Sequence, residues 1–369
     1  FFEWALLLPL AVPTYVIGFV LLGLFEFTGP LQSGLRAVLG PAFRLPALPP
    51  ASGVSLAMTL VLYPYVYVLA RSAFAEQRSG VLEAARSLGR TPFQAARAVT
   101  LPLARPAVAA GIALALMETL ADYGTVAIFG YRTLTEGLFR VWFGMFDRTA
   151  GLQIAALLAG TAIGLLALER WARGRARFHQ ASGRRLEDPL PLSPLPAAAA
   201  LVACGLTLAA GFLLPVAVLV GWGIPALQTG QITSAYPALI RNTVGFGLAA
   251  AALATGAAAV LGYGLRLSPS AFLRVAAAVS AMGYAMPGAA LAVGILTVFA
   301  WLDHAVLGPL WQALGGPAGM VLAGSALGVI LAYVARFLAL GMQSVDAGLA
   351  RIGRSLDEAD RIAAADRVE

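Results

Sequence analysis

The sequence predicts an all-α polytopic membrane protein, and three observations lead to this fold class. The 369 residues are 60% hydrophobic and only 12% charged, whereas a soluble domain carries about a quarter charged residues. Eight apolar runs are long enough for spanning helices, each of which needs about 20 mostly apolar residues. Polar, arginine-bearing segments separate many of these runs. The predicted spans are 4–27, 53–70, 106–129, 151–168, 197–222, 242–265, 272–300 and 320–342.

The arginines predict how the spans are oriented. All 25 basic residues are arginine, and six lie in each of the segments 71–105 and 169–188. Cytoplasmic loops carry an excess of basic residues, so we expect both segments in the cytoplasm. Alternation then gives cytoplasmic and outer loops, with both ends of this chain on the cytoplasmic side. The further cytoplasmic segments are 266–271 and the residues after about 343; the outer loops are 28–52, 130–150, 223–241 and 301–319.

An internal repeat predicts two homologous halves. Pro13 matches Pro287 at an offset of 274, and the tripeptide Gly29-Pro30-Leu31 matches Gly308-Pro309-Leu310. Each half continues into another apolar run and then a polar block, which contains Glu83 in the first half and Glu358 in the second. We expect a first half at 1–168, a basic and Pro-rich cytoplasmic linker at 169–196, and a second half at 197–369. Equivalent halves would lack two spans at each end, so we expect a fragment of a twelve-span protein.

The polar block at 71–105 predicts two short helices joined at a glycine. Val81, Leu82, Ala85 and Leu88 recur at helical spacing, and Gly89 stands where the residue after a helix C-terminus is expected. Thr91-Pro92-Phe93-Gln94 predicts a second helix start, with Thr91 as N-cap and Gln94 completing a capping box. We expect this helix to reach about Thr100, with Pro102 and Pro106 discouraging its continuation into the next span. The apolar face of such a pair is covered either by neighbouring spans or by a partner protein.

A family resemblance favours a partner protein as the cover of this apolar face. The pattern E-A-A-x3-G-x9-hydrophobic-x-L-P is matched by Glu83, Ala84, Ala85, Gly89, Val99, Leu101 and Pro102. It resembles the coupling block of the permease subunits of binding-protein-dependent, type I ABC importers. The resemblance implies a coupling helix that docks into a separate ATP-hydrolysing subunit. The ATPase-docking residues it implies are Glu83, Ala84, Ala85, Leu88, Gly89, Val99, Leu101, Pro102, Glu358 and Ala359.

The second block, 343–369, departs from this pattern. Counted from Glu358, it has Asp360 in place of the second alanine and Ala364 in place of the glycine, and no Leu-Pro follows. We therefore expect a degenerate or incomplete second docking block.

The stretches 115–130 and 131–143 are similar to those of the fused, two-half iron(III)-type permeases. The resemblance implies ATP-driven import by alternating access of a small substrate, iron(III) first, delivered by an extracytoplasmic binding protein. Permeases for thiamine, phosphonate or other small anions share this layout, and a secondary transporter is a further alternative. The implied partners are a pair of ABC ATPase subunits, the binding protein and the lipid bilayer, in a bacterial inner membrane, with no nucleic acid.

Two carboxylates lie within one predicted span. Glu118 and Asp122, four residues apart, are candidates for the translocation path, because charge inside a membrane usually faces a cavity or a partner. Alternatively, Asp122 caps an unwound helix end beside Gly124.

Catalytic chemistry is not expected in this chain. No phosphate-binding loop occurs and there is no lysine to complete one, and no Ser/His/Asp arrangement or Cys/His metal cluster is apparent. We expect no catalytic residue, no metal site and no cofactor, with ATP and Mg²⁺ used by the partner ATPase.

Overall fold

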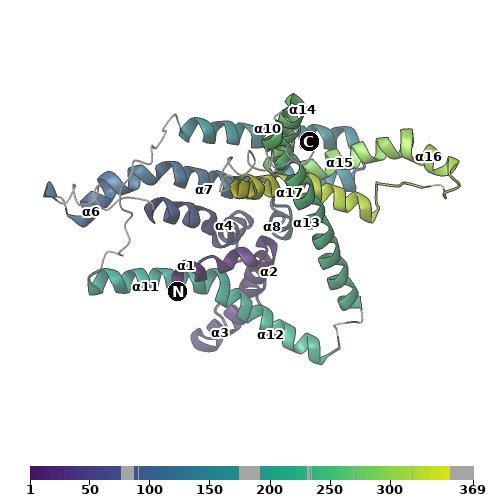
Figure 1. Cartoon of the computed structure of the whole chain (residues 1–369). Coiled ribbons are helices and arrows are strands. Elements are labelled where there is room, and N and C mark those ends of the chain that lie inside the picture. Colours follow the sequence, from purple (N-terminus) through teal and green to yellow (C-terminus); the bar gives the residue numbers. More distant parts are fainter. Residues whose placement is uncertain are drawn as a thin grey trace. The chain divides into compact units, whose positions relative to one another are not determined.

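The computed structural model describes residues 1–75, 87–89, 91–173, 192–230, 233, 235–268, 270–317 and 319–349. Within these residues every regular element is helical (Figure 1). The chain divides into two compact units, Phe1–Gln231 and Ile232–Glu369. This division describes packing, and the predicted boundary between homologous halves at 169–196 stays a prediction.

The predicted number of spans is confirmed. Eight helical segments of the described residues are long and apolar enough to cross a membrane. Six predicted runs match their segments with shifted ends, and the runs 4–27 and 272–300 overlap theirs only in part. These segments are Thr14–Leu39, Pro50–Ala75, Ala96–Ala121, Arg148–Leu168, Pro194–Gln228, Ala235–Leu267, Gly288–Ala313 and Ala326–Leu349.

Unit 1 holds the helices from the start of the chain to residue 228. Its elements are α1 (Phe2–Ala5), η1 (Leu8–Ala11), α2 (Thr14–Phe25), α3 (Pro30–Leu39), α4 (Pro50–Ala75), α6 (Pro92–Ala95), η2 (Ala96–Thr100), α7 (Leu101–Ala121), α8 (Gly124–Ile128), α9 (Leu134–Phe139), η3 (Arg140–Gly144), α10 (Arg148–Arg173), α11 (Pro194–Leu208), η4 (Ala209–Leu213) and α12 (Leu214–Gln228).

The core of unit 1 forms where α2, α4 and α8 meet. Ile17 and Ala57 are fully buried there, and Phe129 packs into the same cluster. Helix α4 also packs along α7, and this pair approaches at Gly111, where an added Cβ would lie 2.6 Å from the Val66 Cα. Small residues allow such close approach between membrane helices, whose association depends on packing.

Unit 2 contains α13 (Ala235–Leu267), α14 (Ala271–Ala285), α15 (Gly288–Leu302), η5 (Asp303–Leu307), α16 (Gly308–Ala313) and α17 (Ala326–Leu349). Helix α13 packs along α17 through a buried stripe of small residues at four-residue spacing: Ala250, Ala254, Ala258 and Gly262. On α17, Gly341 faces this stripe, where an added Cβ would lie 3.0 Å from the Cβ of Ala258. Small residues on both helices thus bring the two backbones together.

Two predicted spans are not single helices, which corrects the sequence analysis. The run 4–27 is interrupted at Pro13, where α2 begins, and the run 272–300 is interrupted at Met286 and Pro287, where α15 begins. The two prolines are the N-cap residues of α2 and α15 and have nearly the same backbone angles, φ −57° and ψ 142° against φ −56° and ψ 133°. Proline lacks the N–H that a continuous helix needs, so both helices restart there.

The span predicted at 106–129 is also displaced. Helix α7 ends at Ala121, and Asp122 has an extended backbone before α8 begins at Gly124. At the other end the helix starts earlier than predicted, as described below for the docking block.

Contacts within each unit bring together segments predicted to share the cytoplasmic side. In unit 1, Glu3 forms an ion pair with Arg71 (2.8 Å), which joins the start of the chain to the end of α4. In unit 2, the Arg266 guanidinium donates to the Leu349 carbonyl (2.6 Å) at the end of α17. A cation at a helix C-terminus is favourable, because the last carbonyls carry partial negative charge.

We predict that Gly111→Ala destabilises unit 1, because the new methyl group meets the α4 backbone, which cannot move aside as a flexible side chain can. The expected cost is about 1–3 kcal/mol, seen as a lower apparent melting temperature of the purified chain in detergent. Gly160→Ala on α10 is the matched control, because no atom lies within 4 Å of its added Cβ. Equal melting temperatures for the two variants would contradict this packing.

Candidate functional site

The polar block at 71–105, which is the predicted docking block, is described in part: residues 71–75, 87–89 and from 91 onward. Gly89 has φ +80°, the left-handed backbone typical of a residue that follows a helix C-terminus. Most of the first short helix predicted before it, residues 81–86, lies outside the described residues. The Leu88 side chain beside it is 83% exposed. Glu83, Ala84, Ala85, Glu358 and Ala359 lie outside the described residues.

The predicted capping box of the second short helix is confirmed. The Thr91 backbone N–H donates to Gln94 Oε1 (3.1 Å), and the Gln94 N–H donates to Thr91 Oγ1 (3.3 Å). This reciprocal pair satisfies two donors that a helix start otherwise leaves unpaired. The described part of the block therefore has a left-handed residue at Gly89 and a capped helix that starts after Thr91.

The predicted end of this helix near Thr100 is wrong. Helix α6 passes into the π-turn η2 and then into α7, and Thr100 and Leu101 have helical backbone angles. Pro102 lies in the first turn of α7 and Pro106 within it. A π-turn changes the hydrogen-bond register, and membrane helices tolerate proline where such local adjustments re-satisfy the freed carbonyls.

Three of the predicted docking residues lie on this continuous helix. Val99 lies in the π-turn η2, and Leu101 and Pro102 begin α7. Leu101 is half exposed and Val99 is partly buried. Apolar side chains at Leu88 and Leu101 are therefore available for contact on the block.

The second candidate site lies at the break between α7 and α8. Asp122 Oδ1 accepts the Thr125 N–H (2.8 Å), and Asp122 Oδ2 accepts the Thr125 hydroxyl (3.0 Å). The Thr14 hydroxyl in the first turn of α2 also donates to Asp122 Oδ2. Asp122 thus caps α8 and ties this break to the start of α2. Glu118 lies partly buried on α7, one turn before it, and a role for either carboxylate in the translocation path stays a prediction.

The carbonyl end of α7 is paired as well. The buried Thr135 hydroxyl donates to the Leu120 carbonyl (2.7 Å), so the last turn of α7 is held by the first turn of α9. The Tyr123 ring stacks on Phe139 of α9, with ring centroids 4.1 Å apart. Both sides of the break therefore have partners inside unit 1.

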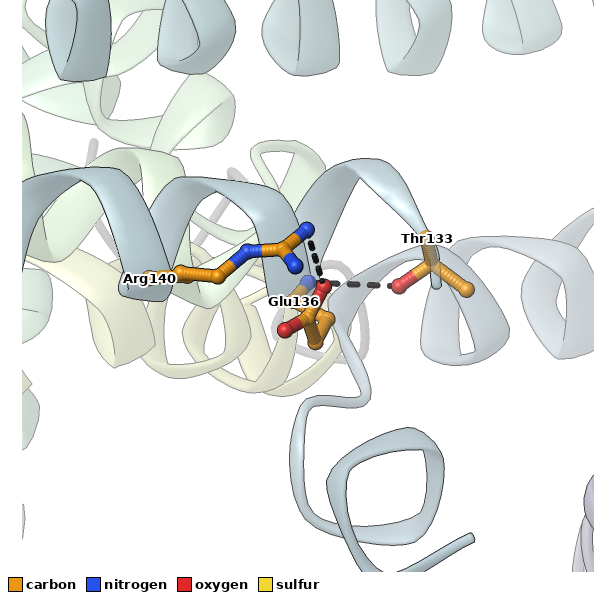
Figure 2. A network of polar contacts seen from close by, with 3 residues as sticks. All are labelled: Thr133, Glu136 and Arg140. Atoms are coloured by element: carbon orange, nitrogen blue, oxygen red, sulfur yellow. Dashed lines mark hydrogen bonds and ion pairs between the residues drawn. The ribbon is translucent and has the colours of Figure 1, made fainter. Parts of the chain in front are cut away.

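Helix α9 is fixed by a small polar network (Figure 2). The Glu136 N–H donates to Thr133 Oγ1 (3.2 Å), which caps the helix. One turn on, Arg140 pairs with Glu136 Oε2 (3.0 Å). Residues 131–143, one of the stretches on which the family resemblance rests, are thus locally well defined.

Sequence analysis missed two charged residues of unit 2. Asp303, predicted in an outer loop, is buried in η5, and its carboxylate accepts the N–H groups of Leu322 (2.9 Å) and Ala323 (2.7 Å). It therefore anchors the segment before α17. Arg336 lies within the last span, and its signal was visible as a lone charge in the apolar run 320–342. In the described residues no group of three or more His, Cys, Asp or Glu is placed to hold a metal ion.

Comparison with known proteins identifies the first part of the chain. Residues 1–168 match the family model described as a binding-protein-dependent transport system inner membrane component. This segment, 168 of the 369 residues, is similar to that permease family. The match includes the docking block, the Asp122 break and the α9 network, and it confirms the resemblance drawn from the sequence.

Three curated relatives illustrate the range of this family. A probable molybdenum ABC transporter permease protein of Haloferax volcanii is 33% identical over 44% of this chain and 57% of its own length. The Fe(3+)-transport system permease protein FbpB 2 of Haemophilus influenzae is 25% identical over 51% of this chain and 33% of its own. The sulfate transport system permease protein CysT of Salmonella typhimurium is 30% identical over 43% of this chain and 57% of its own length. The chain thus spans between a third and three fifths of these relatives, and no solved structure matches it.

We predict that Thr14→Val and Asp122→Asn are energetically coupled. Each single variant should cost about 1–2 kcal/mol, because it leaves a partly buried polar group with fewer partners, and the double variant should show a coupling of at least about 0.5 kcal/mol. Thermal unfolding of the purified chain measures the loss of stability in each single variant and in the double variant.

Thr207→Val provides the matched control for this cycle. Its hydroxyl bonds only the Ala203 carbonyl one turn earlier in α11, so it should not couple to Asp122→Asn. Additive effects for Thr14→Val and Asp122→Asn would contradict the tie between the two breaks.

Proposed function

We propose that this chain is the membrane-spanning permease subunit of an ATP-driven, binding-protein-dependent importer. The family match over residues 1–168 carries the proposal, because it includes the docking block with the spacing expected of such permeases. Its role is transport: substrate arrives from an extracytoplasmic binding protein, and ATP and Mg²⁺ are bound by a pair of separate ABC ATPase subunits. The chain itself contributes neither a catalytic residue nor a cofactor.

The geometry of the block supports a coupling mechanism. The capped start at Thr91 continues without interruption through η2 and α7 to Ala121. A continuous helix of this kind is about 45 Å long at 1.5 Å per residue, enough to cross the membrane. Movement of the block by the ATPase would therefore reach the Asp122 break directly, where α7 is tied to α8 and α2.

Alternating access needs rigid bodies that move against each other at a few deformable points. In unit 1 the restart of α2 at Pro13 and the Asp122 break are joined by the Thr14 hydrogen bond. We propose that these linked breaks are where the docking block's motion is converted into opening and closing.

The backbone angles at the two prolines and the bounds of the helices also support two homologous halves in a twelve-span protein. At the repeat offset of 274, Pro13 corresponds to Pro287, and both are N-caps with matching backbone angles. The same offset superposes α4 (Pro50–Ala75) on α17 (Ala326–Leu349) to within two residues at its start and at its end. We propose that α17 leads into the second docking block as α4 leads into the first.

The proposed orientation is the one derived from the arginines, with both ends of this chain in the cytoplasm of a bacterial inner membrane. The Glu3–Arg71 and Arg266–Leu349 contacts support it, because each joins segments assigned to that side.

We propose a small inorganic anion as the substrate class, and iron(III) as the second candidate. The relative named for sulfate supports the anion, and the relative named for Fe(3+) supports iron(III). At the unit 1 break both oxygens of Asp122 accept hydrogen bonds from Thr14 and Thr125, so this carboxylate is engaged with its own chain and does not argue for a cation as substrate.

We predict that Gly89→Val uncouples ATP hydrolysis from transport and weakens docking about tenfold or more. Valine strongly disfavours the φ of +80° at Gly89, so the turn that precedes the capped helix α6 is lost. Co-purification of the cognate ATPase subunit with the tagged chain measures docking.

Gly40→Val is the matched control, because Gly40 also has a positive φ, +100°, but lies in the predicted outer loop 28–52. It should retain the ATPase subunit. Retention of the subunit by Gly89→Val at the wild-type level would argue against the docking assignment.

A further inference from the structure

Helix α3 turns its polar side chains toward its own chain. These side chains are Gln32, Ser33 and Arg36, and each donates to a backbone carbonyl of the segment 25–28, over 2.8, 3.3 and 2.7 Å. Gln32 Nε2 also donates to the Leu45 carbonyl (3.3 Å), and the residue is only 4% exposed. The polar side of α3 is therefore bonded to the end of α2, beside which the helix packs (Figure 1).

The outward side of α3 is apolar. Leu31, Val38 and Leu39 are 38%, 82% and 58% exposed, and their spacing of seven and eight residues places them on one side of a helix. A surface helix in contact with water shows the reverse arrangement, with its polar residues outward. This face therefore needs an apolar cover, which the described residues of the chain do not supply.

Lipid fits this face better than a partner protein does. Helix α3 is the last part of Thr14–Leu39, one of the candidate membrane spans, so its apolar side continues a segment already expected to contact lipid. Protein interfaces carry about one hydrogen bond per 100–200 Å². With its polar side chains bonded inward, α3 offers a partner protein few such bonds, whereas acyl chains need none.

The charge beside this face suits a membrane surface. The segment 28–52 contains Arg36 and Arg44 and no carboxylate. Both guanidinium groups lie near the Phe27 ring, with Cζ 4.1 and 5.1 Å from its centroid. Helices that lie in a membrane interface combine an apolar face with cations of this kind, which attract the phosphate of lipid headgroups.

The repeat-related helix of unit 2 shows the same exposure. The tripeptide Gly308-Pro309-Leu310, which matches Gly29-Pro30-Leu31, begins α16 as its counterpart begins α3. Leu310, Trp311 and Leu314 are exposed there, and tryptophan is enriched where membrane meets water. An exposed apolar helix thus follows both copies of the tripeptide.

We propose that α3 is an interfacial helix that lies along the membrane surface, with Leu31, Val38 and Leu39 covered by lipid acyl chains. That this surface is the outer one rests on the proposed orientation of the chain. The inward hydrogen bonds of Gln32, Ser33 and Arg36 then tie the end of α2 to a helix held at constant depth.

Site-directed spin labelling of the full chain tests this proposal in vesicles of phosphatidylcholine and phosphatidylglycerol. Cys204 is the only cysteine, so Cys204→Ala provides a background for single labels at Val38→Cys and, as the matched control, at Thr28→Cys in the exposed turn before α3. Oxygen concentrates among acyl chains, whereas a nickel chelate stays in water. The ratio of oxygen to nickel collision rates should be several-fold higher at Val38 than at Thr28.

Leu31→Cys supplies a second position on the same face and should give the Val38 result, which guards against a local effect of one label. Ratios at Val38 and Leu31 as low as that at Thr28 would overturn the proposal. Labels that meet the nickel chelate freely until an extracytoplasmic binding protein is added would overturn it as well, because the cover would then be protein.

The outcome is separable from the proposed function. If the labels on α3 face water while the chain retains its ATPase subunit, the permease function stands and the interfacial helix is wrong. If the labels face lipid in a chain that docks no ATPase, the interfacial helix stands and the importer function is wrong.

Discussion

The structure depends on one constraint: inside a membrane, every backbone N–H and C=O must find a partner within the protein. Unbroken helices meet it automatically, so the breaks determine the rest of the architecture. At the α7–α8 break, Asp122 accepts from Thr125, and Thr135 donates to the Leu120 carbonyl. Each break is therefore a polar junction that fixes neighbouring helices to one another.

These junctions mark where the helices of unit 1 end and restart. The helix from Pro92 to Ala121 is continuous through the π-turn η2, and it joins the predicted docking block to the Asp122 junction. The junction in turn holds the restart of α2 through Thr14. A displacement at the predicted cytoplasmic end thus has a continuous route through the helix to the Asp122 junction, which is what the proposed importer, driven by a separate ATPase, requires.

Sequence alone predicted what composition and local chemistry determine. Eight spans followed from hydropathy, and the Gly89 corner and the Thr91–Gln94 capping box followed from residues within one helical turn. The breaks at Pro13 and Pro287 were missed because an apolar window averages over a single interrupted residue. The helix end predicted near Thr100 was wrong because the π-turn η2 allows the helix to continue past Pro102. The hydrogen bond from Thr14 to Asp122 joins residues far apart in the sequence, so no local pattern contains it.

The most direct test reconstitutes the complete chain in lipid vesicles with its ATPase subunits and binding protein. ATP hydrolysis is then compared with the binding protein loaded and unloaded, using sulfate and iron(III) in turn. The account predicts that hydrolysis rises only with the loaded binding protein and that labelled substrate accumulates on the ATPase side. Hydrolysis that is indifferent to loading, or substrate movement without ATP, would contradict it.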